Sequence, residues 1–404
     1  MEPVWDLAIV GAGPAGASAA LSALYERPAA RVLLIDRSDF PRDKACGDGI
    51  APHALDVLTS VGVHGIEQGY PGVDRLQIGF SDGPMVDGVM PRPAFVVPRE
   101  VFDTRLVRAA VERGAQLRHH RVRTLTDAAG DVPLVLDGRI RARVVIAADG
   151  ASSVIRSQVQ PPLVREPGLP TGLAFLERIR RGAAPSRRAS TAVAIRGYAP
   201  VRASDAGRQV IRFSAPAPRR TTWPAYAWSF PLGDGRANVG YGELLRGREH
   251  PTRQYLLDRL EDLLPGAGSS AHAWRAHLLP LSTGRRRQPD GRTLFAGDAM
   301  NLINPVTGEG IFYAVASGVL AGRAALGPGD PGSTYRSLMR RTLGVHLRHT
   351  DAAALLARSP SIVAAAVRAA DRNPATFDDL VELGLGAGRL TLPTLHRIAA
   401  ALLR

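Results

Sequence analysis

The fold is decided by residues 5–36, which read WDLAIVGAGPAGASAALSALYERPAARVLLID. An apolar run at 5–11 ends in glycines, an alanine-rich segment at 14–26 predicts a helix, and a second apolar run follows at 31–36. Two short apolar runs on either side of a helix are typical of one β-α-β unit. We therefore expect a Rossmann-like α/β domain that starts close to residue 5.

The glycines between the first run and the helix form a dinucleotide fingerprint. Residues 11–16 (GAGPAG) match G-x-G-x-x-G in the strand-to-helix context that makes the pattern specific. The first glycine permits the tight turn, the second leaves room for a pyrophosphate, and the third lets the helix pack on the strand. The helix N-terminus then faces the phosphates. We expect the dinucleotide to be bound here by Gly11, Gly13, Pro14, Ala15 and Gly16.

An acidic residue occupies the position expected for ribose recognition. Asp36 lies at the end of the second apolar run, twenty residues after Gly16. A carboxylate there accepts hydrogen bonds from ribose hydroxyls and repels a 2′-phosphate. We therefore predict that Asp36 and its neighbour Arg37 bind the adenosine end of the dinucleotide.

Two later segments indicate which dinucleotide is bound. Residues 147–153 (AADGASS), followed by Arg156, and residues 295–299 (FAGDA), continuing to the loop 305–310 (PVTGEG), resemble two motifs of the flavoprotein hydroxylase superfamily. Three motifs in this order imply FAD. The resemblance also implies that Arg99, which precedes a predicted helix, reaches the FAD. The other residues it implies in FAD binding are Asp149, Gly150, Gly297, Asp298, Pro305, Gly308, Gly310 and Ile311.

Elementary chemistry supports these assignments in the third motif. The carboxylate of Asp298 suits the ribityl hydroxyls, and the 305–310 loop can bring bare backbone N–H groups to the pyrimidine end of the flavin ring. The helix expected from Ile311 adds its positive N-terminal end there. Such a dipole stabilises the anionic form of reduced flavin.

The segments between these motifs predict a second domain. Alternating apolar and polar residues predict strands at 74–80, 191–195, 209–213, 225–230 and 236–242, typical of an antiparallel sheet with one covered face. From about Pro331 the pattern is helical, with prolines at 360, 374 and 393 separating short helices. We expect a discontinuous FAD-binding domain (1–73, 96–158 and 285–330), an inserted substrate domain (74–95 and 159–284) and a C-terminal helical region (331–404).

Three further segments resemble the geranylgeranyl reductase family along nearly the whole chain: 44–50 (KACGDGI), 226–231 (YAWSFP) and 377–386 (FDDLVELGLG). The resemblance implies that the loop with Lys44, Cys46 and Gly47 lies beside the flavin. It also implies that the second segment lines an apolar tunnel for a polyprenyl chain. Because side chains alternate along a strand, Tyr226, Trp228 and Phe230 would share one face of the sheet.

The implied reaction is hydride transfer from reduced FAD to one carbon of an alkene, with a proton delivered to the other carbon. We take Cys46 and Tyr226 as candidate catalytic residues, and ordered water as the alternative proton source. A helix expected from about Ala51 would lower the pKa of the Cys46 thiol. No second dinucleotide fingerprint is found, so the flavin would be reduced by visiting NAD(P)H or by a separate electron carrier.

The alternative function is an FAD-dependent monooxygenase that epoxidises or hydroxylates an apolar secondary metabolite, since the same three motifs serve both chemistries. A flavin halogenase is disfavoured because its active-site lysine would have to be Lys44, the only lysine in the chain. A prenyl-chain escort without flavin is disfavoured by the intact glycine fingerprint. The expected substrate is an apolar small molecule, either a prenyl lipid or a natural product.

Composition limits the remaining classes of partner. The net charge of +14 comes from a lysine-poor, arginine-rich chain of 404 residues, which fits the codon bias of a GC-rich genome. With 5% aromatic residues and no zinc-finger spacing, nucleic acid is not expected as a partner. Cys46 is the only cysteine, so no intrachain disulfide can form, and the histidines lack further ligands at metal spacing. We expect no metal.

The sequence also bears on localisation. An apolar strand by Val4 leaves no room for a signal peptide, and the longest apolar stretch, 310–322, is too short to span a bilayer. We expect a cytoplasmic protein. The arginines at 285–287 and the amphipathic end at 392–403 leave open a peripheral contact with an anionic membrane. The sequence does not indicate an oligomeric state.

Overall fold

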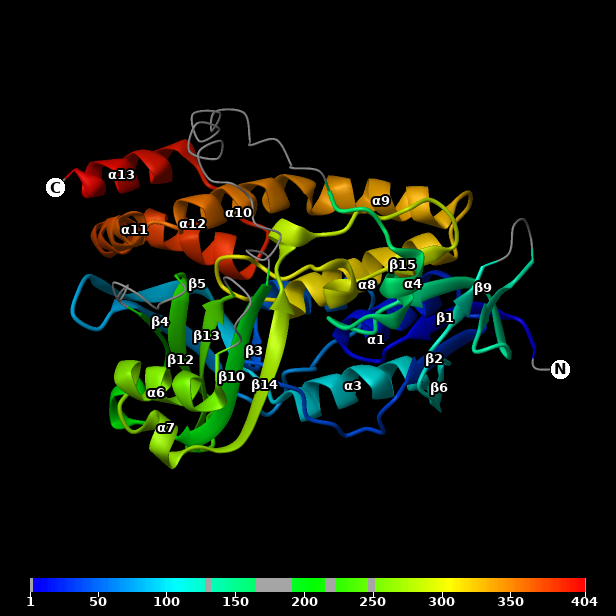
Figure 1. Cartoon of the computed structure of the whole chain (residues 1–404), viewed down its shortest axis with the longest axis horizontal. Coiled ribbons are helices and arrows are strands. Elements are labelled where there is room, and N and C mark those ends of the chain that lie inside the picture. The colour runs from blue at the N-terminus through cyan, green and yellow to red at the C-terminus, as the bar shows by residue number, and fades with distance from the viewer. Residues whose placement is uncertain (1–2, 128–131, 165–190, 215–222, 246–250, 404) are drawn as a thin grey trace.

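The structure is a computed structural model that describes residues 3–127, 132–164, 191–214, 223–245 and 251–403. Two β-sheets lie side by side, each with its own helices, and a group of C-terminal helices extends over both (Figure 1). The predicted fold class is confirmed. Parts of the predicted substrate domain, at 165–190, 215–222 and 246–250, lie outside the described residues.

The first sheet has the strand order β6-β2-β1-β9-β8-β7, with β15 paired to β9. Its strands β1, β2, β6, β9 and β15 are parallel, although the chain between β2 and β9 and between β9 and β15 passes through other elements. The predicted assembly of this sheet from separated segments is therefore observed. The bounds are β1 Trp5–Val10, β2 Val32–Asp36, β6 Gln116–His119, β7 Leu125–Thr126, β8 Leu134–Leu136, β9 Ile140–Ala147 and β15 Thr293–Phe295.

Three helices pack together beside this sheet: α1 (Pro14–Glu26), α3 (Arg99–Glu112) and α8 (Ile311–Ala325). A Cβ atom at Gly318 or Gly322 of α8 would lie 2.2 Å from a backbone oxygen of α1, at Ala15 and Ala19 respectively. The two helices therefore approach with their backbones in contact. These contacts place the first turn of α1 against the middle of α8, and the two helices run in the same direction. Two shorter helices, α2 (Pro52–Thr59) and α4 (Val154–Val159), complete this half.

The second sheet has the order β14-β10-β13-β12-β11-β4-β5-β3. It is antiparallel except at β11 and β4, which pair in parallel, so the expectation of a purely antiparallel sheet is wrong at this one pair. The physical reason is that a segment inserted early in the chain joins one inserted much later, and no hairpin connects them. The bounds are β3 Gly49–Ile50, β4 Gly72–Phe80, β5 Met85–Val96, β10 Thr191–Pro200, β11 Arg208–Phe213, β12 Ala225–Pro231, β13 Arg236–Leu244 and β14 His272–Pro280.

The two faces of the second sheet are covered differently. Helices α6 (Arg253–Leu263) and α7 (Ala267–Ser270) pack on one face, below the sheet in Figure 1. Above it lie the C-terminal helices, of which α11 and α12 contact β5. The predicted prolines stand at the starts of these helices, as proline does where no N–H partner is needed. The bounds are α9 Pro331–Thr342, α10 Gly344–Leu356, α11 Pro360–Arg372, α12 Pro374–Leu385 and α13 Leu392–Leu402.

The helices of the described residues can be compared with the length and hydropathy that a membrane span needs. No single helix there is long and apolar enough to cross a membrane, and α10 with α11 meets the length and composition only across a bend of 115°. Leu392 and Leu403, at the two ends of α13, are exposed. Peripheral contact through this helix stays a prediction.

Candidate active site

A cavity of about 1000 Å³ runs between the two sheets and brings most of the predicted site residues together. Gly16 and Gly297 are the exceptions, because they lie behind the cavity wall, where Gly16 abuts the Gly11 carbonyl and Gly297 abuts Ala15. The predicted residues that line it are Gly11, Gly13, Pro14, Ala15, Asp36, Arg37, Lys44, Cys46, Gly47, Arg99, Asp149, Gly150, Tyr226, Trp228, Phe230, Asp298, Pro305, Gly308, Gly310 and Ile311.

The start of α1 forms a cradle that is free of side chains. Gly11 has φ +102°, and a Cβ there would lie 2.2 Å from the carbonyl oxygen of Ala148 on the neighbouring strand end. A Cβ at Gly13 would lie 3.4 Å from Nη2 of Arg42 and 4.0 Å from Nη2 of Arg99. Two guanidinium groups therefore stand over a bare helix N-terminus. Both features suit a diphosphate, which guanidinium groups and helix N-termini bind.

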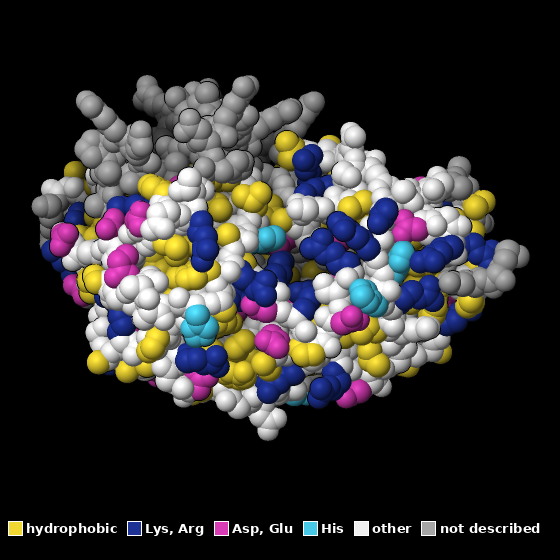
Figure 2. Space-filling model, turned by 60° about the horizontal axis from the view of Figure 1, so that its bottom comes forward, with side chains coloured by type: hydrophobic (Ala, Val, Ile, Leu, Met, Phe, Trp, Pro, Cys, Tyr) yellow, Lys and Arg dark blue, Asp and Glu magenta, His cyan; other side chains and the backbone are white. Residues whose placement is uncertain are grey.

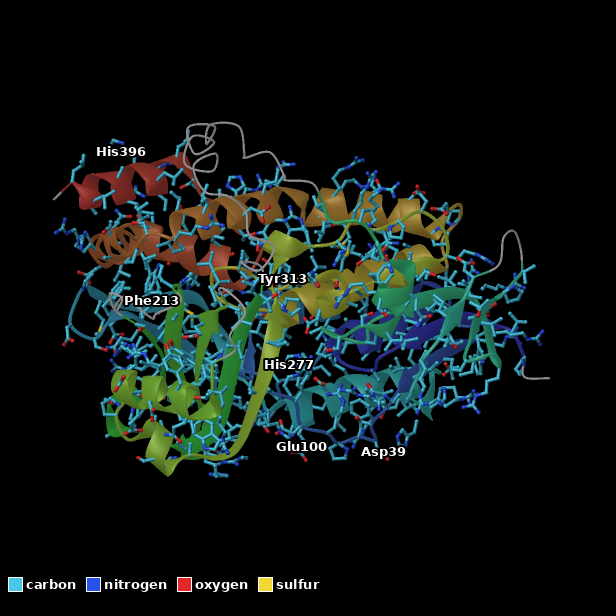
Figure 3. The ribbon with its side chains drawn as sticks, viewed as in Figure 1. Asp39, Glu100, Phe213, His277, Tyr313 and His396 are labelled. Atoms are coloured by element: carbon cyan, nitrogen blue, oxygen red, sulfur yellow. The ribbon has the colours of Figure 1, made fainter. Side chains whose placement is uncertain are left out.

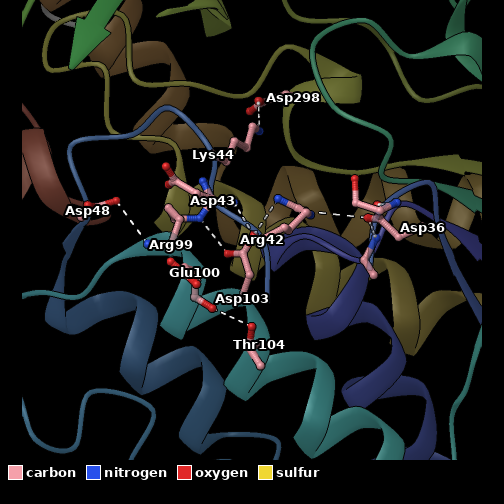
Figure 4. A network of polar contacts seen from close by, with 12 residues as sticks. Asp36, Arg42, Asp43, Lys44, Asp48, Arg99, Glu100, Asp103, Thr104 and Asp298 are labelled. Carbon is pink, nitrogen blue, oxygen red and sulfur yellow. Dashed lines mark hydrogen bonds and ion pairs between the residues drawn. The ribbon is translucent and has the colours of Figure 1, made fainter. Parts of the chain in front are cut away.

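The two arginines are held in place by carboxylates (Figure 4). Arg99 donates from Nε and Nη2 to the two oxygens of Asp103, at 2.7 and 2.8 Å, and is 5% exposed. Arg42 lies 3.3 Å from Asp103 and 3.7 Å from Asp36. Arg99 was expected to reach the FAD, but Arg42 was not recognised. Asp103, the partner of Arg42, lies some sixty residues away in the sequence. The only local signal for Arg42 was its position in the charged run at 42–44.

Asp36 and Asp149 sit at the carboxyl ends of parallel strands, at the same edge of the first sheet. Asp36 accepts hydrogen bonds from the backbone N–H of Ala12 at 2.8 Å and of Ser38 at 2.9 Å, which fixes its carboxylate beside the glycine turn. Asp149 accepts from the N–H of Val154 at 2.7 Å through Oδ2, while its buried Oδ1 has no partner. Burial raises the pKa of Asp149. An unpaired buried acceptor of this kind is suited to a ligand hydroxyl.

The loop 42–48 is clamped between the two sheets. Arg196 on β10 donates to Asp43 and to the Lys44 carbonyl, and Arg275 on β14 donates to Asp43 at 2.6 Å. The Lys44 ammonium lies 3.5 Å from Asp298, the residue expected at the ribityl chain. The only lysine therefore faces the predicted flavin site from the opposite wall, and the loop depends on charged partners from both domains.

Cys46 differs from the sequence-based expectation. Helix α2 starts at Pro52, six residues after Cys46, so the thiol does not lie at the helix N-terminus. Burial raises the pKa of this thiol above its usual value, and the opposing effect of Arg99 is smaller. The expected lowering of the pKa is therefore wrong, and Cys46 stays a neutral thiol at physiological pH.

Tyr226, Trp228 and Phe230 form one row along β12, which we call the aromatic row. Successive ring centroids are 6.0 and 6.4 Å apart. The alternate side chains of the strand are small and face α6, so they belong to a separate core. The loop lies directly on the row, since a Cβ at Gly47 would be 3.4 Å from Phe230 and 3.5 Å from Trp228. The predicted common face is thus observed, and it lines the cavity.

A buried polar network behind the row was not predicted. Asn238 on β13 accepts from Trp228 Nε1 and donates to the Cys46 carbonyl and to Asp48, each at 2.8 Å. Tyr198 donates to Asp48 at 2.6 Å. Burial raises the pKa of Asp48 to about 6, against the lowering effect of these donors. The network joins the loop to the aromatic row, and its members come from three strands and a loop, so no local sequence pattern contains it.

The loop 304–310 closes the cavity on the side of α8. Tyr226 donates its hydroxyl to the carbonyl of Thr307, and burial raises the pKa of Tyr226. Glu309, part of the third motif but given no role from sequence, also lines the cavity. Burial raises the pKa of its carboxyl to about 7. The position of Glu309 between two glycines of the third motif was the sequence signal that could have identified this residue.

No group of three or more His, Cys, Asp or Glu side chains within the described ranges is arranged to hold a metal ion. His346, one of the paired histidines in the sequence, contacts the Tyr313 hydroxyl at 2.6 Å and the Gly388 carbonyl at 2.7 Å. Its ring nitrogens are therefore both engaged in packing α8 against the C-terminal segment.

The glycine cradle, the arginines Arg42 and Arg99 and the unpaired Oδ1 of Asp149 together fit FAD. The fold and the site therefore define an FAD-dependent oxidoreductase. A family model described as "FAD binding domain" matches residues 5–175. Menaquinone reductase of Mycobacterium tuberculosis is 32% identical over 340 residues, covering 78% of this chain and 75% of that protein. Digeranylgeranylglycerophospholipid reductase 2 of Methanopyrus kandleri is 30% identical over 354 residues, covering 83% and 81%.

Structural comparison agrees with the fold. A crystal structure of a geranylgeranyl bacteriochlorophyll reductase-like protein from Thermoplasma acidophilum superposes with a TM-score of 0.62 at 20% identity, covering 99% of this chain and 96% of that one. The chain belongs to the geranylgeranyl reductase family of FAD-dependent oxidoreductases.

Proposed function

We propose that this enzyme hydrogenates a carbon–carbon double bond in the prenyl chain of an apolar isoprenoid lipid. The observation that carries the proposal is the continuity of the cavity, which runs from the diphosphate cradle past the aromatic row into an apolar space between the second sheet and the C-terminal helices. Its far end is lined by Ile78, Ile211 and Phe213 from the sheet and by Val363, Val367 and Phe377 from α11 and α12. A long hydrocarbon fits such walls, and a polar metabolite does not.

The relatives favour the same class of substrate. Their names specify menaquinone and digeranylgeranylglycerophospholipid, and both molecules carry prenyl chains. We propose the prenyl tail of a quinone or of a comparable lipid as the substrate of this chain. Visiting NAD(P)H or a separate electron carrier would supply the electrons.

The residues of the site have distinct roles in this proposal. Bound FAD would supply the hydride chemistry. The bare backbone at Gly11 and Gly13, with Arg42 and Arg99, would hold its diphosphate, and Asp36 and Asp298 would accept from its ribose and ribityl hydroxyls. The protein's other task is to hold the double bond beside the cofactor and keep water out, so most of the catalytic effect comes from positioning.

The aromatic row and the loop above it provide that positioning. Trp228 is fixed by its hydrogen bond to Asn238, and Gly47 lets the loop lie flat on the row. Cys46 and Tyr226 are the proposed proton donors from the sequence, and burial raises the pKa of both, so both are protonated at neutral pH. Tyr226 already donates to Thr307, so protonation of substrate by Tyr226 would require this hydrogen bond to break.

The test is an anaerobic assay on FAD-loaded enzyme with dithionite, NADH or NADPH as reductant. Menaquinone and geranylgeranyl-containing lipids serve as substrates, and product mass is the measurement. A gain of two hydrogen atoms without oxygen, which stays in the prenyl chain after any quinol has been reoxidised to the quinone, supports the proposal. Formation of product only in oxygen, with a gain of one oxygen atom, overturns it in favour of the alternative monooxygenase. The matched control is the Trp228→Ala variant, which changes the apolar half of the cavity and leaves the diphosphate cradle intact. Its turnover is compared with that of the wild type.

A further inference from the structure

Glu309 is a partly buried acid at the end of the cofactor loop, and the proposed reaction gives it no role. It directly precedes Gly310, the N-cap residue of α8. Its Oε1 accepts the backbone N–H of Phe312 at 2.7 Å, and its own carbonyl accepts from Asn304 at 2.7 Å. Glu309 lines the cavity beside Gly308, whose Cβ would lie 3.0 Å from the Tyr226 hydroxyl. The carboxyl is therefore fixed between the N-terminus of α8 and the aromatic row.

Among the described residues, this carboxyl has no ion-pair partner. Within the described part of the chain no cation forms an ion pair with it, and the titratable groups that act on it or are acted on by it are Arg99 from α3, Cys46 from the loop, Tyr226 from β12 and Tyr313 from α8. Arg99 already donates hydrogen bonds from its Nε and Nη2 to Asp103. The positive end of α8 is thus the nearest stabilising influence on a Glu309 carboxylate.

The resemblance of the third motif implies that the pyrimidine end of bound FAD would lie at the same helix end, and this end of the cofactor would become negative on reduction. A Glu309 carboxylate and reduced FAD would then place two negative charges at one helix N-terminus, in a partly buried site. Like charges in such a site cannot both stay ionised without a large cost, so the weaker acid binds a proton.

We propose that Glu309 binds one proton each time the bound FAD accepts two electrons. The donor is a two-electron reductant such as dithionite or a reduced nicotinamide. Two electrons and one proton would reduce the bound cofactor to a monoanion, and the Glu309 carboxylate would take up a second proton and form an O–H bond. The proposal depends on FAD binding at this site and holds whether the enzyme reduces or oxygenates its substrate.

The ionisation of Glu309 in the structure supports this assignment. Burial raises the pKa of the carboxyl to about 7, although the N–H groups of Phe312 and Ile311 and the charge of Arg99 lower it. At neutral pH a large fraction is therefore ionised and able to take up a proton. A negative charge on the neighbouring cofactor raises the pKa further. Proton uptake should extend from near pH 7 to the higher pKa of the reduced state.

The test is the pH dependence of the flavin midpoint potential, measured without substrate on the FAD-loaded enzyme. We expect the wild type to take up two protons for two electrons above pH 7, and Glu309→Gln to take up one, so the slope against pH halves. Asp351→Asn is the matched control, since burial also raises the pKa of Asp351 to about 6 but its partner is Arg285, outside the cofactor loop. It should keep the wild-type slope.

Two results would overturn the proposal. One is a wild-type slope of one proton for two electrons across the whole range, and the other is an unchanged two-proton slope in Glu309→Gln. If that variant loses FAD, infrared difference spectra of the wild type decide instead: a protonated carboxyl band must appear on reduction, and its absence refutes the assignment. Because no substrate is present, these outcomes are independent of the alkene assay.

Discussion

The cavity has two halves of opposite character. The dinucleotide half, around Gly11, Gly13, Asp36, Arg42 and Arg99, is built from bare backbone and charge pairs. The apolar half runs from the aromatic row to α11 and α12, and branched and aromatic side chains form its walls. Figure 2 shows the basic side chains gathered around the hollow in the middle of this face. His277, on β14, lines the cavity and is labelled in Figure 3.

The two halves tolerate change differently. A diphosphate requires N–H groups and cations at fixed positions, so a single added methyl group in the glycine turn removes the site. A hydrocarbon requires volume and shape, which many side chains share, so the loss of one wall residue weakens binding in proportion to the lost contact. A single substitution in the dinucleotide half should therefore abolish or strongly weaken binding, whereas a single substitution in the apolar half should weaken binding only in part.

The largest expected effect is that of Gly11→Ala. Its φ of +102° disfavours any side chain, and the Cβ would lie 2.2 Å from the backbone oxygen of Ala148, which cannot move without shifting the strand. We expect FAD affinity to fall by a factor of about 100 or more, corresponding to about 3 kcal/mol. Gly114→Ala is the control, because Gly114 has φ +109° with no atom within 4 Å of its Cβ position. FAD titration should show loss of binding only in Gly11→Ala, and equal binding in both would contradict the cradle.

A smaller effect is expected for Trp228→Ala in the apolar half. The ring is 6% exposed, and its removal should lower the free energy of unfolding by about 3–5 kcal/mol while raising KM for a prenyl substrate about tenfold. The FAD content should stay at the wild-type level. Urea unfolding and flavin absorbance measure the two effects. Trp228→Phe keeps most of the ring and should show the smaller KM change, and loss of FAD in both variants would mean that the halves are not separable.

The smallest effect is expected at the border between the halves. Lys44 lies 3.5 Å from Asp298, and its side chain is 29% exposed, so this ion pair contributes at most about 1 kcal/mol. Lys44→Gln should weaken FAD binding only about two- to fivefold, and added salt should reduce the difference. Lys44→Arg keeps the charge and should bind FAD like the wild type. A loss as large as that of Gly11→Ala would place Lys44 in direct contact with the diphosphate.

The same division explains what could be predicted. The β-α-β unit, the three FAD motifs and the shared face of Tyr226, Trp228 and Phe230 follow from local spacing, because turn geometry and strand alternation are properties of neighbouring residues. The prediction of a lowered pKa for Cys46 was wrong because burial depends on residues that are distant in the chain. Arg42, Asp48 and Asn238 were missed for the same reason, since each acts through partners on other elements.

The sequence by itself determined the cofactor class and the family, since a glycine turn binds phosphate through its own backbone. The tertiary structure decided how the site is completed. Only folding brings Arg42 over Gly13, holds the loop 42–48 between two sheets and places the partly buried Glu309 at the start of α8. Electrostatic strength depends on burial and on the nearest charge, and both are set by which distant segments meet.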